Sequence, residues 1–224
     1  MMPLATLNKM PADLVICVAT PLEGAYLREN LPPAIPLLIT GVGAVNAAIA
    51  LTRFLERQGA LAVVVCGIGG AYPGSGLQVG SSVAWASSEC YGDLGAASAD
   101  GFLDMAALGF PVIAGPEPVF NTLPVPLRPR EMAGVPFVTV NTCTGDDVSA
   151  RALAARTGGA VESMEGAAIA HVACLYGIPA GEVRGISNPV GNRDRSAWRV
   201  REAALAAQQE LSRALRGGEL LPQA

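Results

Sequence analysis

Residues 61–70 have the sequence Leu-Ala-Val-Val-Val-Cys-Gly-Ile-Gly-Gly, an apolar run that passes directly into glycines. Six apolar residues rich in valine, with a glycine boundary, are typical of a buried β-strand. Five further runs share this length and apolar character. They are residues 14–19, 37–40, 82–87, 137–141 and 183–187. We predict that residues 61–66 and these five runs form the strands of one sheet.

Longer, alanine-rich stretches with helical spacing alternate with these strands. Helices are predicted over residues 44–58 and 163–176, and a covering helix over residues 198–215. Strands that alternate with helices indicate an α/β fold in layers. Residues 100–136 are rich in proline and glycine, so we expect long surface loops there. We treat residues 1–224 as a single domain.

Composition excludes several classes of protein. The 224 residues are 51% hydrophobic and 15% charged, which predicts a folded domain with a sizeable core. A net charge of −4 argues against a nucleic-acid partner. No apolar stretch approaches the roughly 18 to 20 residues of a membrane helix. Residues 1–9 lack a basic start followed by an apolar segment, so we expect a cytoplasmic protein.

Side-chain chemistry is restricted as well. The chain has one histidine, His171, one lysine, Lys9, and five cysteines with no close pair. This excludes a P-loop lysine and, outside His171, a Ser-His-Asp triad. Glu162 and Glu165 lie three apart, but no histidine follows at metal-ligand spacing, so we predict no metal site. The remaining groups for chemistry are carboxylates, amides and the backbone.

Four predicted strand ends carry unusual residues, and ligands bind at strand ends in folds of this class. They are residues 20–23, 67–70, 162–166 and 186–189. Taken alone, the third also fits simple helix capping by Ser163 with Glu165 in the first turn. Residues 40–46 begin like a dinucleotide-binding motif, but Asn46 replaces the third glycine. We therefore interpret those glycines as a tight turn.

Residues 161–170, Val-Glu-Ser-Met-Glu-Gly-Ala-Ala-Ile-Ala, resemble the purine nucleoside phosphorylase and nucleosidase superfamily, as do residues 177–179 and 183–188. Residues 19–23 and 67–71 fit its first and its glycine-rich strand ends. The resemblance implies a three-layer α/β sandwich, with a central mixed sheet flanked by helices. It also implies a purine nucleoside as small-molecule substrate, no metal or organic cofactor, and a homodimer or larger homo-oligomer.

In this superfamily a Met-Glu pair on the long helix holds the ribose. The resemblance thus assigns Met164 to packing on the sugar and Glu165 to its 2′- and 3′-hydroxyls. A fixed carboxylate there stabilises the positive charge that develops on the ribose as the N-glycosidic bond breaks. The glycines of residues 67–70 permit close approach of the backbone to a flat or sugar-like ligand, and a purely structural turn is an equal alternative. Gly67, Ile68 and Gly69 are therefore the candidates for backbone contact with the substrate.

Glu23 matches the glutamate with which nucleosidases of the superfamily activate water. A carboxylate accepts a proton from water but repels phosphate, so the resemblance favours hydrolysis. Phosphorylases of this type carry an arginine and a serine where this chain has Val64 and Gly67. We therefore expect no phosphate site.

Asn188 stands where adenine nucleosidases of the superfamily carry an aspartate that protonates N7 of the base. An amide donates a hydrogen bond but no proton, which suits a 6-oxopurine such as hypoxanthine. Residues 186–198 resemble a branch whose substrate also carries a carboxyphenyl group beyond the 5′ carbon. Arg193 and Arg195 are the candidates for that group, with exposure to solvent or pairing with Asp194 as open alternatives. Trp198 is expected to start the covering helix as a core aromatic.

The predicted function is thus hydrolysis of a 6-oxopurine nucleoside, with Glu23 and Asn188 as the catalytic residues. Three alternatives remain open. They are a methylthioadenosine or adenosylhomocysteine nucleosidase, a phosphate-dependent phosphorylase, and a nucleoside-binding protein without activity. Which group protonates the leaving base is also open, with water or Asp194 as candidates.

Overall fold

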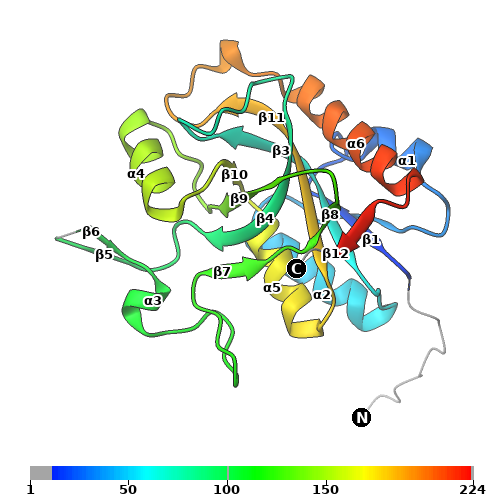
Figure 1. The fold of residues 1–224 in the computed structure, drawn as a ribbon, viewed down its shortest axis with the longest axis horizontal. Coiled ribbons are helices and arrows are strands. Elements are labelled where there is room, and N and C mark those ends of the chain that lie inside the picture. Colours follow the sequence, from blue (N-terminus) through cyan, green and yellow to red (C-terminus); the bar gives the residue numbers. More distant parts are fainter. Residues whose placement is uncertain (1–11, 100, 223–224) are drawn as a thin grey trace.

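The computed structural model describes residues 12–99 and 101–222, and a ten-stranded mixed sheet is its central element (Figure 1). In chain order the strands are β1 (Val15–Val18), β2 (Leu37–Ile39), β3 (Val63–Ala71), β4 (Val83–Tyr91), β7 (Thr122–Pro124), β8 (Leu127–Pro129), β9 (Gly134–Thr139), β10 (Val161–Ser163), β11 (Ala180–Pro189) and β12 (Leu220–Pro222). Strands β5 (Ala96–Ser98) and β6 (Gly101–Leu103) form a separate hairpin. The α-helices are α1 (Ala25–Asn30), α2 (Ala44–Arg57), α3 (Met105–Leu108), α4 (Asp147–Thr157), α5 (Gly166–Tyr176) and α6 (Val200–Arg216). No described helix is long and apolar enough to cross a bilayer.

Strand β11 is the centre of the sheet because it pairs with three neighbours. It runs parallel to β3 and β8 and antiparallel to β4. Strand β4 continues to β9, β9 to β10, and β10 returns to β3 in antiparallel pairing. The five strands β11, β4, β9, β10 and β3 thus close into a ring. This ring brings the ends of β3, β10 and β11 together.

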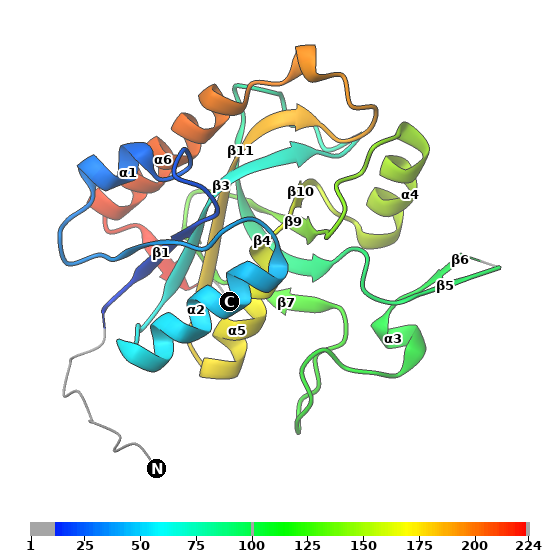
Figure 2. The ribbon, with the colours of Figure 1, turned by 180° about the vertical axis from the view of Figure 1, so that it is seen from behind.

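Helices cover both faces of the sheet (Figures 1 and 2). Helices α2 and α5 pack on one face against Val63 and Val65 of β3. Helices α1 and α6 pack on the other face against Val64 and Cys66. Every second side chain of this strand therefore enters a different core, which explains why the run is apolar at every position. The predicted α/β sandwich with a central mixed sheet is confirmed.

All six predicted strands are present, and β3 is longer than predicted. It continues through the glycines to Ala71, whereas the sequence analysis ended it at Cys66. The glycines permit this because neighbours crowd the strand. A Cβ at Gly69 would lie 2.5 Å from Cγ1 of Val161, and one at Gly70 2.7 Å from Cγ2 of Val190. Glycines occupy these positions because the neighbouring chain segments pack too closely for a side chain, and not because the strand ends there.

The helix predicted over residues 163–176 was wrong at its start. Val161–Ser163 is strand β10, paired with β9 and β3, and helix α5 begins only at Gly166. Ser163 therefore caps no helix. The expectation of loops over residues 100–136 was also wrong in part, because β7 and β8 join the main sheet there. The tight turn predicted at residues 40–46 is confirmed by positive φ angles of 85° at Gly41 and 96° at Gly43.

Candidate active site

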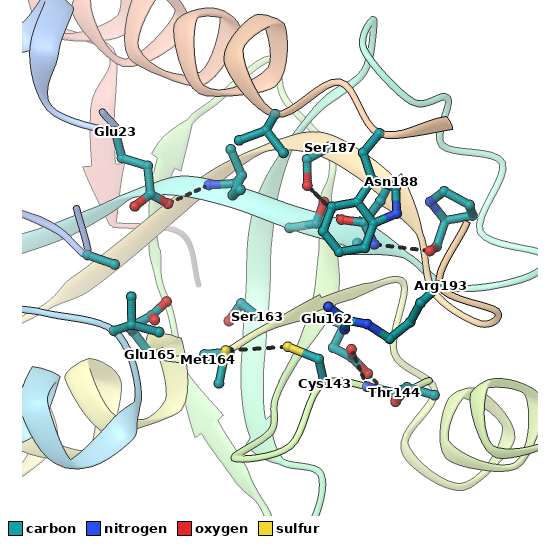
Figure 3. Close-up of a pocket in the computed structure, with 18 of the residues that line it drawn as sticks. Glu23, Cys143, Thr144, Glu162, Ser163, Met164, Glu165, Ser187, Asn188 and Arg193 are labelled. Carbon is teal, nitrogen blue, oxygen red and sulfur yellow. Dashed lines mark hydrogen bonds between the residues drawn. The ribbon is translucent and has the colours of Figure 1, made fainter. Parts of the chain in front are cut away.

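A pocket of about 360 Å³ collects all four segments that the sequence analysis singled out (Figure 3). Residues from the loop after β1, from β3, from the turn between β10 and α5, and from β11 line it. Among them are Glu23, Ile68, Gly69, Met164, Glu165, Asn188 and Arg193. Gly67 is buried and is not part of this lining. Within the described ranges, no three His, Cys, Asp or Glu side chains gather as a metal site would require.

Glu23 is buried, with 4% of its surface exposed, and two donors fix its carboxylate. The backbone N–H of Ile68 donates to Oε1 at 3.0 Å, and the Thr20 hydroxyl donates to Oε2 at 2.7 Å. Gly67 makes room for it, because a Cβ there would lie 2.5 Å from Oε1 of Glu23. These two hydrogen bonds leave lone pairs on both oxygens free to accept hydrogen bonds from a ligand or a water molecule in the pocket.

Glu165 is the N-cap residue of α5 and is 5% exposed. Its Oε1 accepts the backbone N–H of Gly43 at 3.0 Å, and its Oε2 lies 3.3 Å from Nη1 of Arg184. The positive φ at Gly43 is part of the turn that presents this N–H. The sequence analysis had placed Glu165 and Met164 on a helix. Both instead lie in the turn that precedes α5.

Arg184 is the residue of this site that sequence reasoning missed. It is 2% exposed on β11, is not part of the pocket lining, and its guanidinium pairs with Glu165. Its Nη1 also donates to the backbone oxygen of Ile68 at 3.1 Å. Burial opposes its charge, but the neighbouring carboxylates of Glu182 and Glu165 outweigh burial and raise its pKa. The arginine between Val183 and Gly185, inside the predicted strand 183–187, was the available signal.

Asn188 lies near the end of β11, where the register with β3 shifts between Ile186 and Asn188. The Ser187 hydroxyl donates to Oδ1 of Asn188 at 2.7 Å, and Nδ2 donates to the backbone oxygen of Pro189 at 3.0 Å. An amide nitrogen carries two hydrogens, so one N–H remains for a ligand. The side chain is thereby oriented as a donor toward the pocket.

Glu162 has a supporting place that the sequence analysis did not identify. Its carboxylate accepts the backbone N–H and the hydroxyl of Thr144, at 3.0 and 2.5 Å, and the hydroxyl of Tyr72 at 2.8 Å. These bonds hold the loop that follows β9 against the pocket. The Cys143 thiol on this loop contacts the sulfur of Met164 at 3.4 Å.

Arg193 enters the pocket, whereas Arg195 is exposed and is not part of the lining. Figure 3 shows Arg193 beside Asn188, across the pocket from Glu23 and Glu165. Its guanidinium lies 5.1 Å from the ring centre of Trp198. Trp198 lines the pocket and precedes α6, so the prediction that it starts the covering helix as a core aromatic was wrong.

Comparison with known proteins defines the class to which this fold and pocket belong. The family model described as Phosphorylase superfamily matches residues 33–217. The 5′-methylthioadenosine/S-adenosylhomocysteine nucleosidase from Colwellia psychrerythraea, solved in complex with adenine, has the same fold. The two structures superpose with a TM-score of 0.75 and share 20% sequence identity, and the match covers 96% of this chain and 98% of that chain.

Two curated relatives narrow the class further. The futalosine hydrolase of Thermus thermophilus is 38% identical over 186 residues, which cover 80% of this chain and 80% of that protein. The futalosine hydrolase of Streptomyces coelicolor is 40% identical over 188 residues, covering 80% of this chain and 77% of the relative. The chain belongs to the phosphorylase superfamily and, within it, to the futalosine hydrolase family.

Proposed function

We propose that this protein hydrolyses the N-glycosidic bond of futalosine to release hypoxanthine and dehypoxanthine futalosine, a step of menaquinone biosynthesis. As a member of its family it is a hydrolase acting on N-glycosyl bonds, with a small-molecule nucleoside as substrate. One observation carries the residue assignment. Two buried carboxylates, those of Glu23 and Glu165, line one pocket together with the amide of Asn188.

Glu165 is proposed to accept the 2′- and 3′-hydroxyls of the ribose, with Met164 packed on the sugar. Its hydrogen bond from Gly43 and its ion pair with Arg184 hold the carboxylate before substrate arrives. As the glycosidic bond lengthens, positive charge grows on the ribose ring, and a nearby fixed carboxylate stabilises it more than the ground state. Glu165 therefore lowers the barrier electrostatically.

Glu23 is proposed to take a proton from the attacking water. The donors Ile68 and Thr20 orient its two oxygens, and its free lone pairs remain available to bind water. The same geometry disfavours phosphate. The related phosphorylases carry a serine where this chain has Gly67. A side chain at position 67 would collide with the Glu23 carboxylate as it is placed here, so this site cannot hold both groups. This supports water as the nucleophile.

Asn188 is proposed to bind the hypoxanthine base through its free N–H, because O6 and N7 of a 6-oxopurine both accept. Arg193 lies on the same side of the pocket (Figure 3), so we assign it to the base end of the substrate. This departs from the sequence-based expectation that it holds the 5′ substituent. The contact of Arg195 with that substituent stays a prediction.

The substrate assignment predicts which nucleosides are cleaved. Purified protein incubated with futalosine, inosine or methylthioadenosine should release free base fastest from futalosine, measured by chromatography. The rate should be equal with and without phosphate, and phosphorus NMR should find no sugar 1-phosphate. Faster cleavage of methylthioadenosine would contradict the substrate, and a sugar 1-phosphate as main product would contradict hydrolysis.

Asn188→Asp should penalise 6-oxopurines. An ionised aspartate would oppose the O6 and N7 acceptors, and an unmatched buried polar contact costs about 1 to 3 kcal/mol. This corresponds to a roughly five- to hundredfold fall in kcat/KM for futalosine. Activity on 6-amino analogues should fall less or rise, because their amino group donates to the new carboxylate.

The quantity to measure is the ratio of kcat/KM for the two substrate types, in wild type and variant. Asn30→Asp, at the last residue of α1, makes the same change away from the pocket and serves as control. A ratio that Asn188→Asp leaves unchanged would show that this amide does not recognise the base.

We also propose that the chain forms one domain and acts in the cytoplasm as a homodimer or larger homo-oligomer. The continuous sheet, with strands from Val15 to Pro222, supports one domain. The five free cysteines fit a reducing compartment. Val42, which lines the pocket, and Val45 and Ile49 on α2 are exposed and offer an apolar face to a second subunit. Sedimentation velocity should therefore give a mass above that of a monomer.

A further inference from the structure

A cluster of buried charged groups lies beneath the pocket, and the proposed reaction uses only part of it. Glu89 on β4 is 0% exposed and Glu182 on β11 is 1% exposed. Glu182 pairs with Arg184, whose charge also acts on Glu89. Charged side chains are almost never this buried unless they are paired. Four carboxyl groups, including Glu23 and Glu165, surround a single guanidinium here. The charges do not balance if all four are ionised.

The contacts of Glu182 and Glu89 show which carboxyl groups can share a proton and so reduce the excess negative charge. Nε of Arg184 donates to Oε1 of Glu182 at 2.7 Å, while Oε2 of Glu182 is buried and has no hydrogen-bond donor among the described residues. This Oε2 and Oε1 of Glu89 meet over Gly166, where a Cβ would collide with both. Oε2 of Glu89 accepts hydrogen bonds from the backbone N–H of Cys90 and from the hydroxyl of Thr139, each at 3.1 Å. A proton between the two carboxyl groups supplies the missing donor.

We propose that Glu89 and Glu182 hold one proton between them and that this pair, by fixing Arg184, positions Glu165 for the ribose. The proton is carried by Oε1 of Glu89 and donated to Oε2 of Glu182. Glu182 keeps its charge and binds Arg184 through Nε, so that Nη1 is directed at Glu165. Glu89 and Glu182 are thus positioning residues, and the positioning role rests on the proposed function.

The electrostatics agree with this geometry. Burial, and then the neighbouring Glu182 carboxylate, raise the pKa of Glu89 well above its usual value. Burial raises the pKa of Glu182 too, but Arg184 counteracts this, which leaves the proton on Glu89. Gly166 is the first residue of α5, and only a residue without a side chain leaves space for the two carboxyl groups to meet.

Other titratable and charged groups lie near the pair. They are Cys90 and Tyr91 on β4, Cys66 on β3, Arg184 on β11 and Glu165 at the start of α5. Burial, reinforced by Glu89, raises the pKa of Cys90 and of Tyr91 to about 12. Burial likewise raises the pKa of Cys66. A proton that this cluster releases in moderately alkaline solution is therefore assigned to the pair.

The proton can be observed without any assay of activity. At pH 8 exposed carboxyl groups are ionised, so an infrared carbonyl band of a protonated carboxylic acid should belong to Glu89. We expect this band in the wild-type protein and its loss in Glu89→Gln. Glu202→Gln, an exposed change on α6, should keep the band. Absence of the band in wild type, or its persistence in Glu89→Gln, would overturn the shared proton even if the enzyme cleaves futalosine.

The positioning role is tested by a double-mutant cycle. Glu182→Gln should lower kcat about tenfold or more with little change in KM, because it acts through Arg184 on Glu165. In a Glu165→Gln background the same change should cost less than twofold, since the group it positions is gone. Equal costs in both backgrounds would show a merely structural role and overturn the positioning, whatever the substrate proves to be.

The pH profile provides a second test if Glu182→Gln does not fold. Ionisation of the pair places two carboxylates in contact and disturbs Arg184, so wild-type kcat should fall in alkaline solution. Glu89→Gln keeps a neutral donor to Glu182 and should move this fall to higher pH by one unit or more. An alkaline limb that is identical in wild type and Glu89→Gln would overturn the proposal.

Discussion

Glu23→Gln is expected to lower kcat by about 10²-fold or more, the usual contribution of a general base, while the fold and substrate binding are retained. The glutamine oxygen can still accept the N–H of Ile68, and the Thr20 hydroxyl can rotate to accept from the new amide. What the variant cannot do is take a proton from water. Steady-state kinetics with futalosine, together with the melting temperature, measure the two parts of this expectation.

Glu29→Gln is the matched control for this variant, because it makes the same change on the exposed surface of α1. It should leave kcat within about twofold of wild type. If turnover of Glu23→Gln stays within threefold, Glu23 is not the base. If both variants lose activity equally, the loss has a cause other than the pocket.

Glu165→Gln is expected to lower kcat by about 10²- to 10³-fold, the range seen when one preorganised electrostatic contact to a transition state is removed. The amide keeps the shape of the side chain and can still accept the N–H of Gly43. It removes the negative charge that faces the developing cation on the ribose. Because that charge matters most in the transition state, kcat should fall far more than KM rises.

Substrate binding and turnover must be measured separately to test this. The exposed Glu202→Gln on α6 again serves as the control for loss of one charge. A large rise in KM with unchanged kcat would mean that Glu165 binds the ribose equally in ground and transition states. That outcome would contradict electrostatic stabilisation by this residue.

Much of the fold could be predicted from local patterns. The predicted strands that correspond to β1, β3, β4 and β11 are largely apolar because helices cover both faces of the sheet. A strand that is buried on both faces can therefore be recognised from its residue types alone. The ends of elements were less predictable. Val161–Ser163 is a strand only because β9 and β3 flank it, and the apolar spacing that follows had indicated a continuous helix.

The site was partly predictable for a related reason. Unusual residues at the predicted ends of strands marked Glu23, Glu165 and Asn188, and all three line one pocket. The partners of these residues were not predictable. Gly43 bonds Glu165 across 122 positions of sequence, and no local pattern encodes such a contact. The position of Arg193 was not predictable either, because it depends on the turn after β11, which brings this residue into the pocket on the side of Asn188 (Figure 3).

The sequence by itself determined the class of fold and the kind of chemistry. Its periodic apolar runs specify a helix-covered sheet, and its single histidine and lysine leave carboxylates and amides for the reaction. The tertiary structure decided how those groups act. Closure of β3, β4, β9, β10 and β11 into one ring places Arg184 next to Glu165 and brings Glu89 on β4 against Glu182. The physical reason is that a buried charge depends on partners from distant strands, and only the folded chain brings them within hydrogen-bonding distance.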